Sequence, residues 1–215
     1  MTIDGPVASG KTTVAREVAT RLGFTLLDTG AIYRSLALVA GRRRVALDDA
    51  EALAGLAADL DITFELAAGV NRVRLAGEDV SAEIRRPEIS RAASIVSALP
   101  EVRAALLDRQ RSIAAAGDVV AEGRDTGTVV FPAAEAKFFI TASDEVRARR
   151  RQREQAGRGQ ELPFPEVLAA LRERDQRDAT RSVAPMRPAE DAHVIDTSDL
   201  DLEQVVAEVL ARIPD

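Results

Sequence analysis

Short runs of apolar residues alternate along the chain with longer segments in which apolar positions recur every three or four residues. The short runs cover residues 24–27, 118–121, 136–140 and 192–195, and a fifth run, residues 2–4, opens the chain. Short apolar runs separated by helical patterns are typical of parallel strands that helices cover on both faces. The pattern therefore predicts an α/β fold with a five-stranded parallel sheet flanked by helices.

One region departs from this alternation. Residues 62–66 and 70–80 alternate apolar with polar positions, which predicts an antiparallel meander with a polar outer face. Two helical patterns follow, over about residues 81–99 and 100–116. We interpret residues 56–95 as a small subdomain inserted into the main fold.

An arginine-rich segment precedes a polar, glycine-rich loop. Residues 143–153 open with a serine and two acids, which favour a helix start, and then carry five arginines. Residues 155–163 are too polar for a core, so residues 146–165 are predicted to form a short lid. The whole chain, residues 1–215, is then one domain, and its core comprises residues 1–55, 96–145 and 175–215.

The clearest chemistry follows the first strand. Gly5 and Gly10 are separated by four residues and precede Lys11 and Thr12, which matches the P-loop pattern G-x-x-x-x-G-K-[ST]. Such loops turn backbone N–H groups toward an anion, the lysine reaches the β- and γ-phosphates, and the hydroxyl binds magnesium. The alternative is a glycine-rich turn before an ordinary helix, but it explains neither the lysine nor the hydroxyl. We expect a nucleoside triphosphate to bind residues Gly5, Pro6, Val7, Ala8, Ser9, Gly10, Lys11, Thr12 and Thr13.

Composition excludes several other functions. The net charge of −6 argues against a nucleic-acid surface, and the absence of cysteine excludes disulfides and thiolate chemistry. His193 is the only histidine, so it forms neither a triad nor a metal cluster. No apolar run approaches the roughly 20 residues of a membrane span, and the P-loop leaves no room for a signal peptide. We therefore expect a cytoplasmic protein that binds neither membranes nor nucleic acid.

Among P-loop proteins, a kinase fits the remaining features best. The N-K-x-D and D-x-x-G strings of a GTPase do not occur, and 215 residues leave little room for the second domain of a remodelling ATPase. A kinase needs a second pocket and a lid that excludes water, because an exposed phosphoryl donor would be hydrolysed. The predicted insert and lid supply both.

Five motifs, in this order, closely resemble those of bacterial cytidylate kinases. They cover residues 5–12, 27–34, 77–85, 122–132 and 174–185. The resemblance implies a P-loop NTPase fold with core, nucleotide-monophosphate insert and lid. It also implies transfer of the γ-phosphoryl group of ATP to CMP or dCMP, with Mg²⁺, by a monomer in pyrimidine nucleotide metabolism. Two departures, a threonine at Thr29 and a glutamate at Glu122, keep the hydroxyl and the carboxylate of the family.

The resemblance also assigns roles to single residues. Arg34, Arg124 and Arg181 match positions that grip the acceptor phosphate, and Arg174 and Asp178 match positions that hold the ribose. Ser94, Arg103 and Asp125 match the positions that read the base. The implied CMP site comprises Thr29, Tyr33, Arg34, Ser94, Arg103, Arg124, Asp125, Arg174, Asp178 and Arg181. On the ATP side, the lid arginines are Arg147, Arg150 and Arg151, the catalytic set is Lys11, Arg124, Arg151 and Arg181, and Mg²⁺ would contact Thr12 and, through water, Glu122.

Each assignment has a simpler alternative in the residues alone. Arg34 and Arg103 could be helix-surface arginines, and the alternating charges of residues 172–178 look like a solvated helix face. Asp125 could pair with Arg124 or another neighbour, and Glu122 could be the structural partner of an arginine. The cluster Arg42, Arg43 and Arg44 is assigned to solvent. The alternatives for the whole chain are a kinase for another acceptor, such as shikimate, and a nucleotide-binding regulator with a vestigial acceptor pocket.

Overall fold

The computed structural model describes residues 1–67, 70–115, 117–157 and 159–214. The chain divides into two compact units. The first comprises residues 1–18 and 124–215, and the second comprises residues 19–123.

Five short strands form the predicted parallel sheet. Their order is β2-β6-β1-β7-β8, and each strand begins within one residue of an apolar run in the sequence. The strands are β1 (Thr2–Asp4), β2 (Thr25–Asp28), β6 (Val119–Gly123), β7 (Lys137–Thr141) and β8 (His193–Asp196). The α/β prediction is therefore confirmed.

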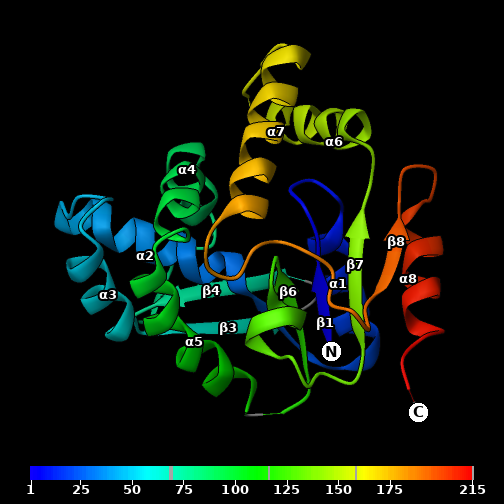
Figure 1. Cartoon of the computed structure of the whole chain (residues 1–215), viewed down its shortest axis with the longest axis horizontal. Helices are drawn as coiled ribbons and strands as arrows, with labels where there is room; N and C mark the ends of the chain where they lie inside the picture. The colour runs from blue at the N-terminus through cyan, green and yellow to red at the C-terminus, as the bar shows by residue number, and fades with distance from the viewer. Residues whose placement is uncertain (68–69, 116, 158, 215) are drawn as a thin grey trace. The chain divides into compact units, whose positions relative to one another are not determined.

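In the first unit, β1, β7 and β8 run side by side (Figure 1), with Thr2 opposite Lys137 and Phe138 opposite His193. Its helices are α1 (Lys11–Leu22), which continues into the second unit, α6 (Asp144–Ala156), α7 (Phe164–Thr180) and α8 (Leu202–Leu210). One short π-helical turn, η2 (Thr126–Val130), follows β6. Ile3, Phe138 and Ile140 are almost completely buried and form part of this unit's core.

The α6 helix begins as predicted. The Ser143 hydroxyl accepts a hydrogen bond from the Val146 N–H, which caps the helix, and Asp144 and Glu145 occupy its first turn. Ala148 on α6 packs with Val167 and Leu171 on α7 in a small apolar cluster. These contacts join the two helices.

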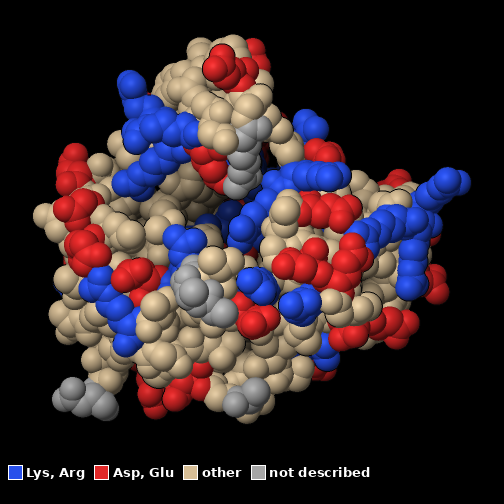
Figure 2. All heavy atoms as spheres, turned by 180° about the vertical axis from the view of Figure 1, so that it is seen from behind, with Lys and Arg blue, Asp and Glu red and all other residues tan. Residues whose placement is uncertain are grey.

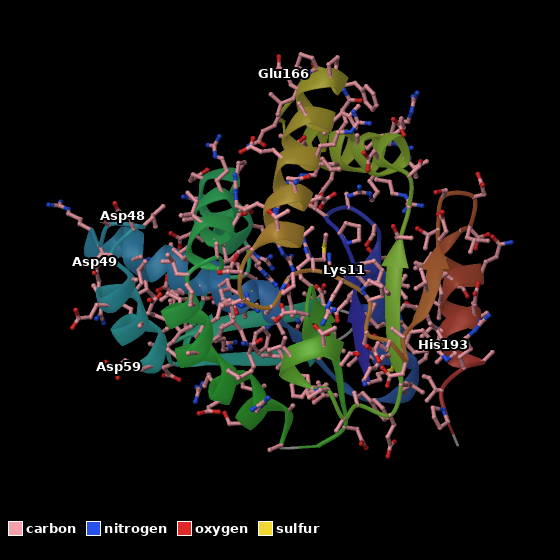
Figure 3. All side chains as sticks on the ribbon, in the orientation of Figure 1. Lys11, Asp48, Asp49, Asp59, Glu166 and His193 are labelled. Atoms are coloured by element: carbon pink, nitrogen blue, oxygen red, sulfur yellow. The ribbon has the colours of Figure 1, made fainter. Side chains whose placement is uncertain are left out.

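The second unit carries the remaining helices and the meander. The helices are α2 (Thr29–Arg43), α3 (Ala50–Ala58), α4 (Pro87–Val96) and α5 (Pro100–Ala114), with the 3₁₀ turn η1 (Glu83–Arg85). Helix α3 packs against α5, and α2 packs against α4. Asp49 caps the start of α3 through the Ala52 N–H, and Asp59 lies at its other end (Figure 3).

The meander is confirmed as the antiparallel strands β3 (Ile62–Ala67), β4 (Val70–Leu75) and β5 (Glu78–Asp79). The helix predicted over residues 81–99 is wrong in its first part, where η1 and α4 are separate elements. Pro87 disfavours helical backbone at Arg86, which is extended with ψ 146°, so α4 begins only at Pro87.

The limits of the predicted insert and lid stay predictions, because Ala68 and Gly69 in the one and Arg158 in the other lie outside the described residues. Within residues 1–67, 70–115, 117–157 and 159–214, no helix has the length and apolar character needed to cross a membrane.

Candidate functional site

The P-loop lies between β1 and α1 and has the backbone of an anion-binding loop. A Cβ atom on Gly5 would come within 2.0 Å of the Ile140 carbonyl oxygen, so this position requires glycine. Gly10 has φ 94°, which glycine adopts without strain, and Ala8 has φ 58°, which is uncommon for a residue with a side chain. The loop leads directly into the N-terminal end of α1, where helix N–H groups favour an anion.

Lys11 and Thr12 occupy the first two positions of α1 (Figure 3 labels Lys11). The Lys11 side chain is buried, and its Nζ donates a hydrogen bond to the Pro6 carbonyl at 3.2 Å. Thr12 is exposed. Ser9 is fully buried, and its hydroxyl has no hydrogen-bond partner in the described structure, which suits a loop that receives anionic oxygens.

The described residues contain no group of three or more His, Cys, Asp or Glu side chains that could hold a metal ion. Kinase magnesium sites rarely need such a group, because Mg²⁺ is held by one or two protein oxygens together with substrate phosphates and water. The exposed Thr12 hydroxyl beside the loop therefore fits the donor set expected for Mg²⁺.

Arg147 on α6 is enclosed by protein groups. Its guanidinium donates to the Ala142 carbonyl at 3.0 Å and to the Val7 carbonyl at 3.1 Å. It also forms ion pairs with Asp144 and with Asp175 on α7. The side chain predicted to contact ATP is thus already bonded to the P-loop itself.

Arg150 and Arg151 differ in environment. Arg150 donates to the Ser9 carbonyl at 3.1 Å and to the hydroxyl and carbonyl of Thr197, at 2.9 and 2.6 Å. Burial lowers the pKa of the Arg150 guanidinium, the nearby Arg153 charge lowers it further, and Asp196 partly opposes the shift. Arg151 instead pairs with Glu154 one turn along α6, at 2.8 Å. In Figure 2, Lys and Arg side chains gather near the top of the view, where α6 and α7 lie.

Four of the predicted acceptor residues form two ion pairs in the first unit. Arg124 Nε donates to Asp178 at 3.0 Å, and Arg181 Nη2 donates to Asp125 at 2.9 Å. All four side chains are largely buried. The pairing of Asp125 with a neighbour, weighed from the sequence, is present, with Arg181 as the partner.

Arg174 and Asp178 lie near each other on α7. Burial alone raises the pKa of the Asp178 carboxyl, but the charges of Arg124, Arg174 and Arg181 outweigh it and place the pKa below its ordinary value. Asp178 is 5% exposed, so it is no part of a solvated helix face. The charge run of residues 172–178 therefore has a buried side as well as an exposed one.

Asp4, which was not predicted, anchors the backbone beside these pairs. Its carboxylate accepts hydrogen bonds from the Thr126 N–H and hydroxyl, at 2.9 and 2.8 Å, and from the Gly127 N–H at 2.8 Å. Burial raises the pKa of Asp4, although these three donors act in the opposite direction. Asp4 thereby fixes the turn that immediately follows Arg124 and Asp125.

In the second unit, Asp28, Gly30 and Arg34 form one local arrangement. The Asp28 carboxylate caps α2 through the Ala31 N–H and pairs with Arg34 at 2.7 Å. A Cβ atom on Gly30 would lie 2.9 Å from an Arg34 guanidinium nitrogen, so glycine makes room for this pair. Arg34 is only 20% exposed, which contradicts a helix-surface role.

The base-reading candidates of this unit are also buried. Arg103 on α5 lies over the Tyr33 ring, 5.5 Å from its centroid, and donates to the Ser97 carbonyl at 3.1 Å. Ser94 on α4 is 5% exposed and Arg103 is 7% exposed. The alternative of a surface arginine at position 103 is wrong.

Glu122 lies near the end of β6, and Thr29 directly follows β2, the strand that pairs with it. Glu122 is opposite Asp28 in the β2–β6 pair and is buried. The Thr29 hydroxyl donates to the Glu122 backbone carbonyl at 2.8 Å. The backbone of Glu122 therefore has a structural role beside whatever its carboxylate does.

Two further basic residues form ion pairs. Arg42 is exposed as predicted, but it forms ion pairs with Glu78 and Glu83, both at 2.7 Å, that tie α2 to the meander and to η1. Lys137 opens β7, is buried and pairs with Asp191 at 2.7 Å. His193 is exposed on β8, and its ring lies 5.6 Å from that of Phe138 (Figure 3).

Asp175 was not predicted from the sequence. For Asp175 a signal existed, because Val167, Leu171, Asp175 and Asp178 follow one another at helical spacing and so share a face of α7. Thr197 is buried directly after β8, where parallel-sheet proteins place functional groups.

Comparison with known proteins identifies the family. The family model for cytidylate kinase matches residues 1–215. Cytidylate kinases of Vibrio cholerae and Aliivibrio salmonicida are 51% and 49% identical to the chain over 213 residues, covering 99% of this chain and 95% of each relative. A crystal structure of an uncharacterized protein from Eubacterium ventriosum has a TM-score of 0.52 at 12% identity over 99% of this chain and 96% of that chain, which shows a shared fold alone. The chain therefore belongs to the cytidylate kinase family.

Proposed function

We propose that this protein transfers the γ-phosphoryl group of ATP to CMP and dCMP, giving ADP with CDP or dCDP. The observation that carries the proposal is a complete P-loop, with its lysine and hydroxyl in place, in a chain of the cytidylate kinase family. The enzyme would act in pyrimidine nucleotide metabolism, as a monomer with a core, a nucleotide-monophosphate insert at about residues 56–95 and a lid at about residues 146–165.

ATP would bind along residues 5–13 and the α6 arginines. Backbone N–H groups of the loop would receive phosphate oxygens, and Lys11 would move from the Pro6 carbonyl to the β- and γ-phosphates. Thr12, and Glu122 through water, would hold Mg²⁺, which would supply positive charge that offsets the charge of the phosphates. Arg151, whose partner Glu154 is exposed, is the lid arginine that can turn to the triphosphate at least cost.

CMP would be recognised through three groups of residues. Arg34, Arg124 and Arg181 would hold the acceptor phosphate, since a guanidinium fork suits bidentate contact with phosphate oxygens. Arg174 and Asp178 would bind the ribose hydroxyls. The base would contact Ser94, Arg103 and Asp125, with Thr29 and Tyr33 completing the site.

The reaction itself needs positioning and positive charge. An oxygen of the CMP phosphate attacks the γ-phosphorus in line with the bridging oxygen, the bond to that oxygen breaks, and ADP leaves with the electron pair. Lys11, Arg124, Arg151 and Arg181 would offset the negative charge on the transferring group. No covalent intermediate is required, which fits a chain without cysteine.

A coupled assay of ADP formation tests the proposal. ATP and Mg²⁺ are supplied, and CMP, dCMP, UMP, AMP or shikimate is added singly. We expect CMP and dCMP to give the highest kcat/KM. Turnover that prefers AMP, UMP or shikimate would assign a different acceptor, and an ADP signal that no acceptor increases would favour a nucleotide-binding regulator.

A further inference from the structure

Two arginines of α6 bind backbone carbonyls of the P-loop. Arg147 donates to the Val7 carbonyl and Arg150 to the Ser9 carbonyl, each at 3.1 Å. Residues three apart on a helix share a face, so α6 offers both guanidinium groups to the loop at once. The Thr197 hydroxyl donates to the same Ser9 carbonyl at 3.1 Å.

These contacts orient the loop's N–H groups. In a trans peptide unit the C=O of one residue and the N–H of the next lie in one plane and point in opposite directions. When Arg147 holds the Val7 carbonyl, the Ala8 N–H must point away from α6. When Arg150 donates to the Ser9 carbonyl, the Gly10 N–H must likewise point away from α6. The two arginines thus fix the direction of two backbone N–H donors of an anion-binding loop, and they do so through the loop's own carbonyl groups.

Asp175 on α7 completes the arrangement. One of its carboxylate oxygens accepts from the Val7 N–H at 3.3 Å, and the other pairs with Arg147. Both backbone polar groups of Val7 are therefore bonded to this one ion pair. The pair is well enclosed, with side-chain exposures of 16% for Asp175 and 6% for Arg147.

Arg147 has little capacity left for ATP. A guanidinium has five N–H donors, and four of them are used by Ala142, Val7, Asp175 and Asp144. A direct role on the triphosphate would require breaking a buried ion pair. A role through the Val7 peptide requires no rearrangement.

The loop also needs such support. Ala8 has φ 58°, a conformation disfavoured for residues with a Cβ atom, so surrounding contacts must maintain it. Val7 and Ala8 pack against the apolar cluster of Ala148, Val167 and Leu171 on α6 and α7. Polar and apolar contacts from the same two helices therefore determine the loop's shape.

We propose that Asp175 is a positioning residue for ATP, which acts through Arg147 and, beside Arg150, holds the P-loop peptides with their N–H groups turned to the phosphates. The inference rests on the proposed function, because it takes ATP to be the ligand of the loop. It differs from the family resemblance by giving Arg147 an indirect role and by adding Asp175.

Binding of ADP and of CMP to Asp175→Asn, each measured alone by calorimetry, tests the inference. Asparagine has one acceptor oxygen where aspartate uses two, so it cannot keep both contacts in their present positions, and the loop loses its fixed geometry. We expect the Kd for ADP to rise about 10-fold or more, the loss typical of a hydrogen bond to a charged group, and the Kd for CMP to change less than about 3-fold. The KM for ATP should rise by a larger factor than kcat falls.

A matched control lies on the same helix. Glu173 is exposed and pairs with Arg177, so Glu173→Gln should bind ADP and CMP as the wild type does. Asp175→Glu, which keeps the charge, should recover part of the ADP affinity. If Asp175→Asn does not fold, Asp175→Glu and Arg147→Lys decide instead, and the proposal then requires both to weaken ADP binding more than CMP binding.

A double-mutant cycle tests whether Asp175 and Arg147 act as one unit. If Arg147 acts through Val7 together with Asp175, then Asp175→Asn combined with Arg147→Lys should cost much less ADP affinity than the two single changes added. Fully additive losses would overturn the inference, as would wild-type ADP binding by folded Asp175→Asn. A wild-type protein that binds ADP but does not phosphorylate CMP would contradict the proposed function and leave this inference intact.

Discussion

At the residue scale, the charged groups proposed for CMP in the first unit hold one another in place. Asp125 pairs with Arg181 and Asp178 pairs with Arg124, and all four side chains are largely buried. Removing one partner of a buried pair costs about 3 kcal/mol or more, because the other charge is left uncompensated. A substitution at either carboxylate should therefore also disturb an arginine that is proposed to bind the acceptor phosphate.

Asp125→Ala should narrow the preference for CMP over UMP. If Asp125 and Arg103 read the base, as the resemblance implies, cytosine offers an N4 amine to the carboxylate and ring acceptors to the guanidinium, whereas uracil presents an oxygen and an N–H instead. We expect kcat/KM for CMP to fall about 100-fold, because buried polar groups are left unpaired, and the lower value for UMP to fall much less. Steady-state kinetics with both acceptors measure this. Equal proportional losses would mean that Asp125 only supports Arg181.

Lys11→Ala should abolish transfer while the fold persists. Lys11 donates to the loop's own Pro6 carbonyl, whereas in the proposed reaction its charge acts on the transferring phosphate. We expect kcat to fall at least about 1000-fold and the Tm to change by no more than a few degrees. Thermal unfolding and the coupled assay on one preparation decide this. Near-normal turnover would contradict the assignment of residues 5–13 as the ATP-binding loop.

Asp178 should make stability depend on acid pH. The pKa of Asp178 lies below its ordinary value of 3.8 in the folded protein, because three arginine charges outweigh the effect of burial. A carboxyl group with a lowered folded pKa contributes stability above its unfolded pKa and loses it as the pH falls through the folded pKa. From about pH 5 to about pH 2, the free energy of unfolding should therefore fall more steeply in the wild type than in Asp178→Asn.

Urea unfolding at a series of pH values measures these slopes. Asp48→Asn, at an exposed position before α3 (Figure 3), is the control and should keep the wild-type slope. Parallel curves for the wild type and Asp178→Asn would show that the arginines do not stabilise the ionised carboxylate.

At the scale of elements, the sequence predicted what local pattern determines. Apolar runs located all five parallel strands, and the serine at position 143 located the start of α6, because strand burial and helix capping depend on neighbouring residues. The break at Pro87 also has a local cause and was missed because the helical spacing continues through it.

The contacts of α6 could not be predicted in the same way. Arg147 binds Val7 across 140 positions in sequence, and Asp175 binds Val7 across 168. Helical spacing placed Arg147 and Arg151 on one face, but only the packing of α6, α7 and the loop shows that Arg147 is buried and Arg151 pairs with Glu154. Arginines that look alike in the sequence therefore have different environments in the structure.

Arg151→Ala should lower kcat far more than it lowers stability. If the lid brings Arg151 to the triphosphate, its loss removes charge from the transition state, and arginines in this role contribute about 1000-fold or more. Arg153→Ala, an exposed arginine of the same helix, should retain wild-type kcat. Wild-type kcat in Arg151→Ala would mean that Arg151 has no part in phosphoryl transfer and only pairs with Glu154.

At the scale of the whole molecule, family membership rests on similarity along nearly the entire chain. The matched relatives cover 99% of it at about half identity, so core, meander and arginine-rich helices all belong to the shared sequence. The roles of single residues come from a resemblance of motifs and from local geometry within each unit. Direct phosphoryl transfer from ATP to CMP is the proposed activity on which all of these residue roles depend.

Transfer of label from [γ-³²P]ATP distinguishes phosphorylation of CMP from hydrolysis of ATP. The protein is incubated with labelled ATP, Mg²⁺ and CMP, with Lys11→Ala as the control, and the products are separated by thin-layer chromatography. Direct transfer places label in the β-phosphate of CDP, in step with ADP formation, and none appears with Lys11→Ala. Label that appears only as inorganic phosphate, at a rate unchanged by CMP, would contradict it.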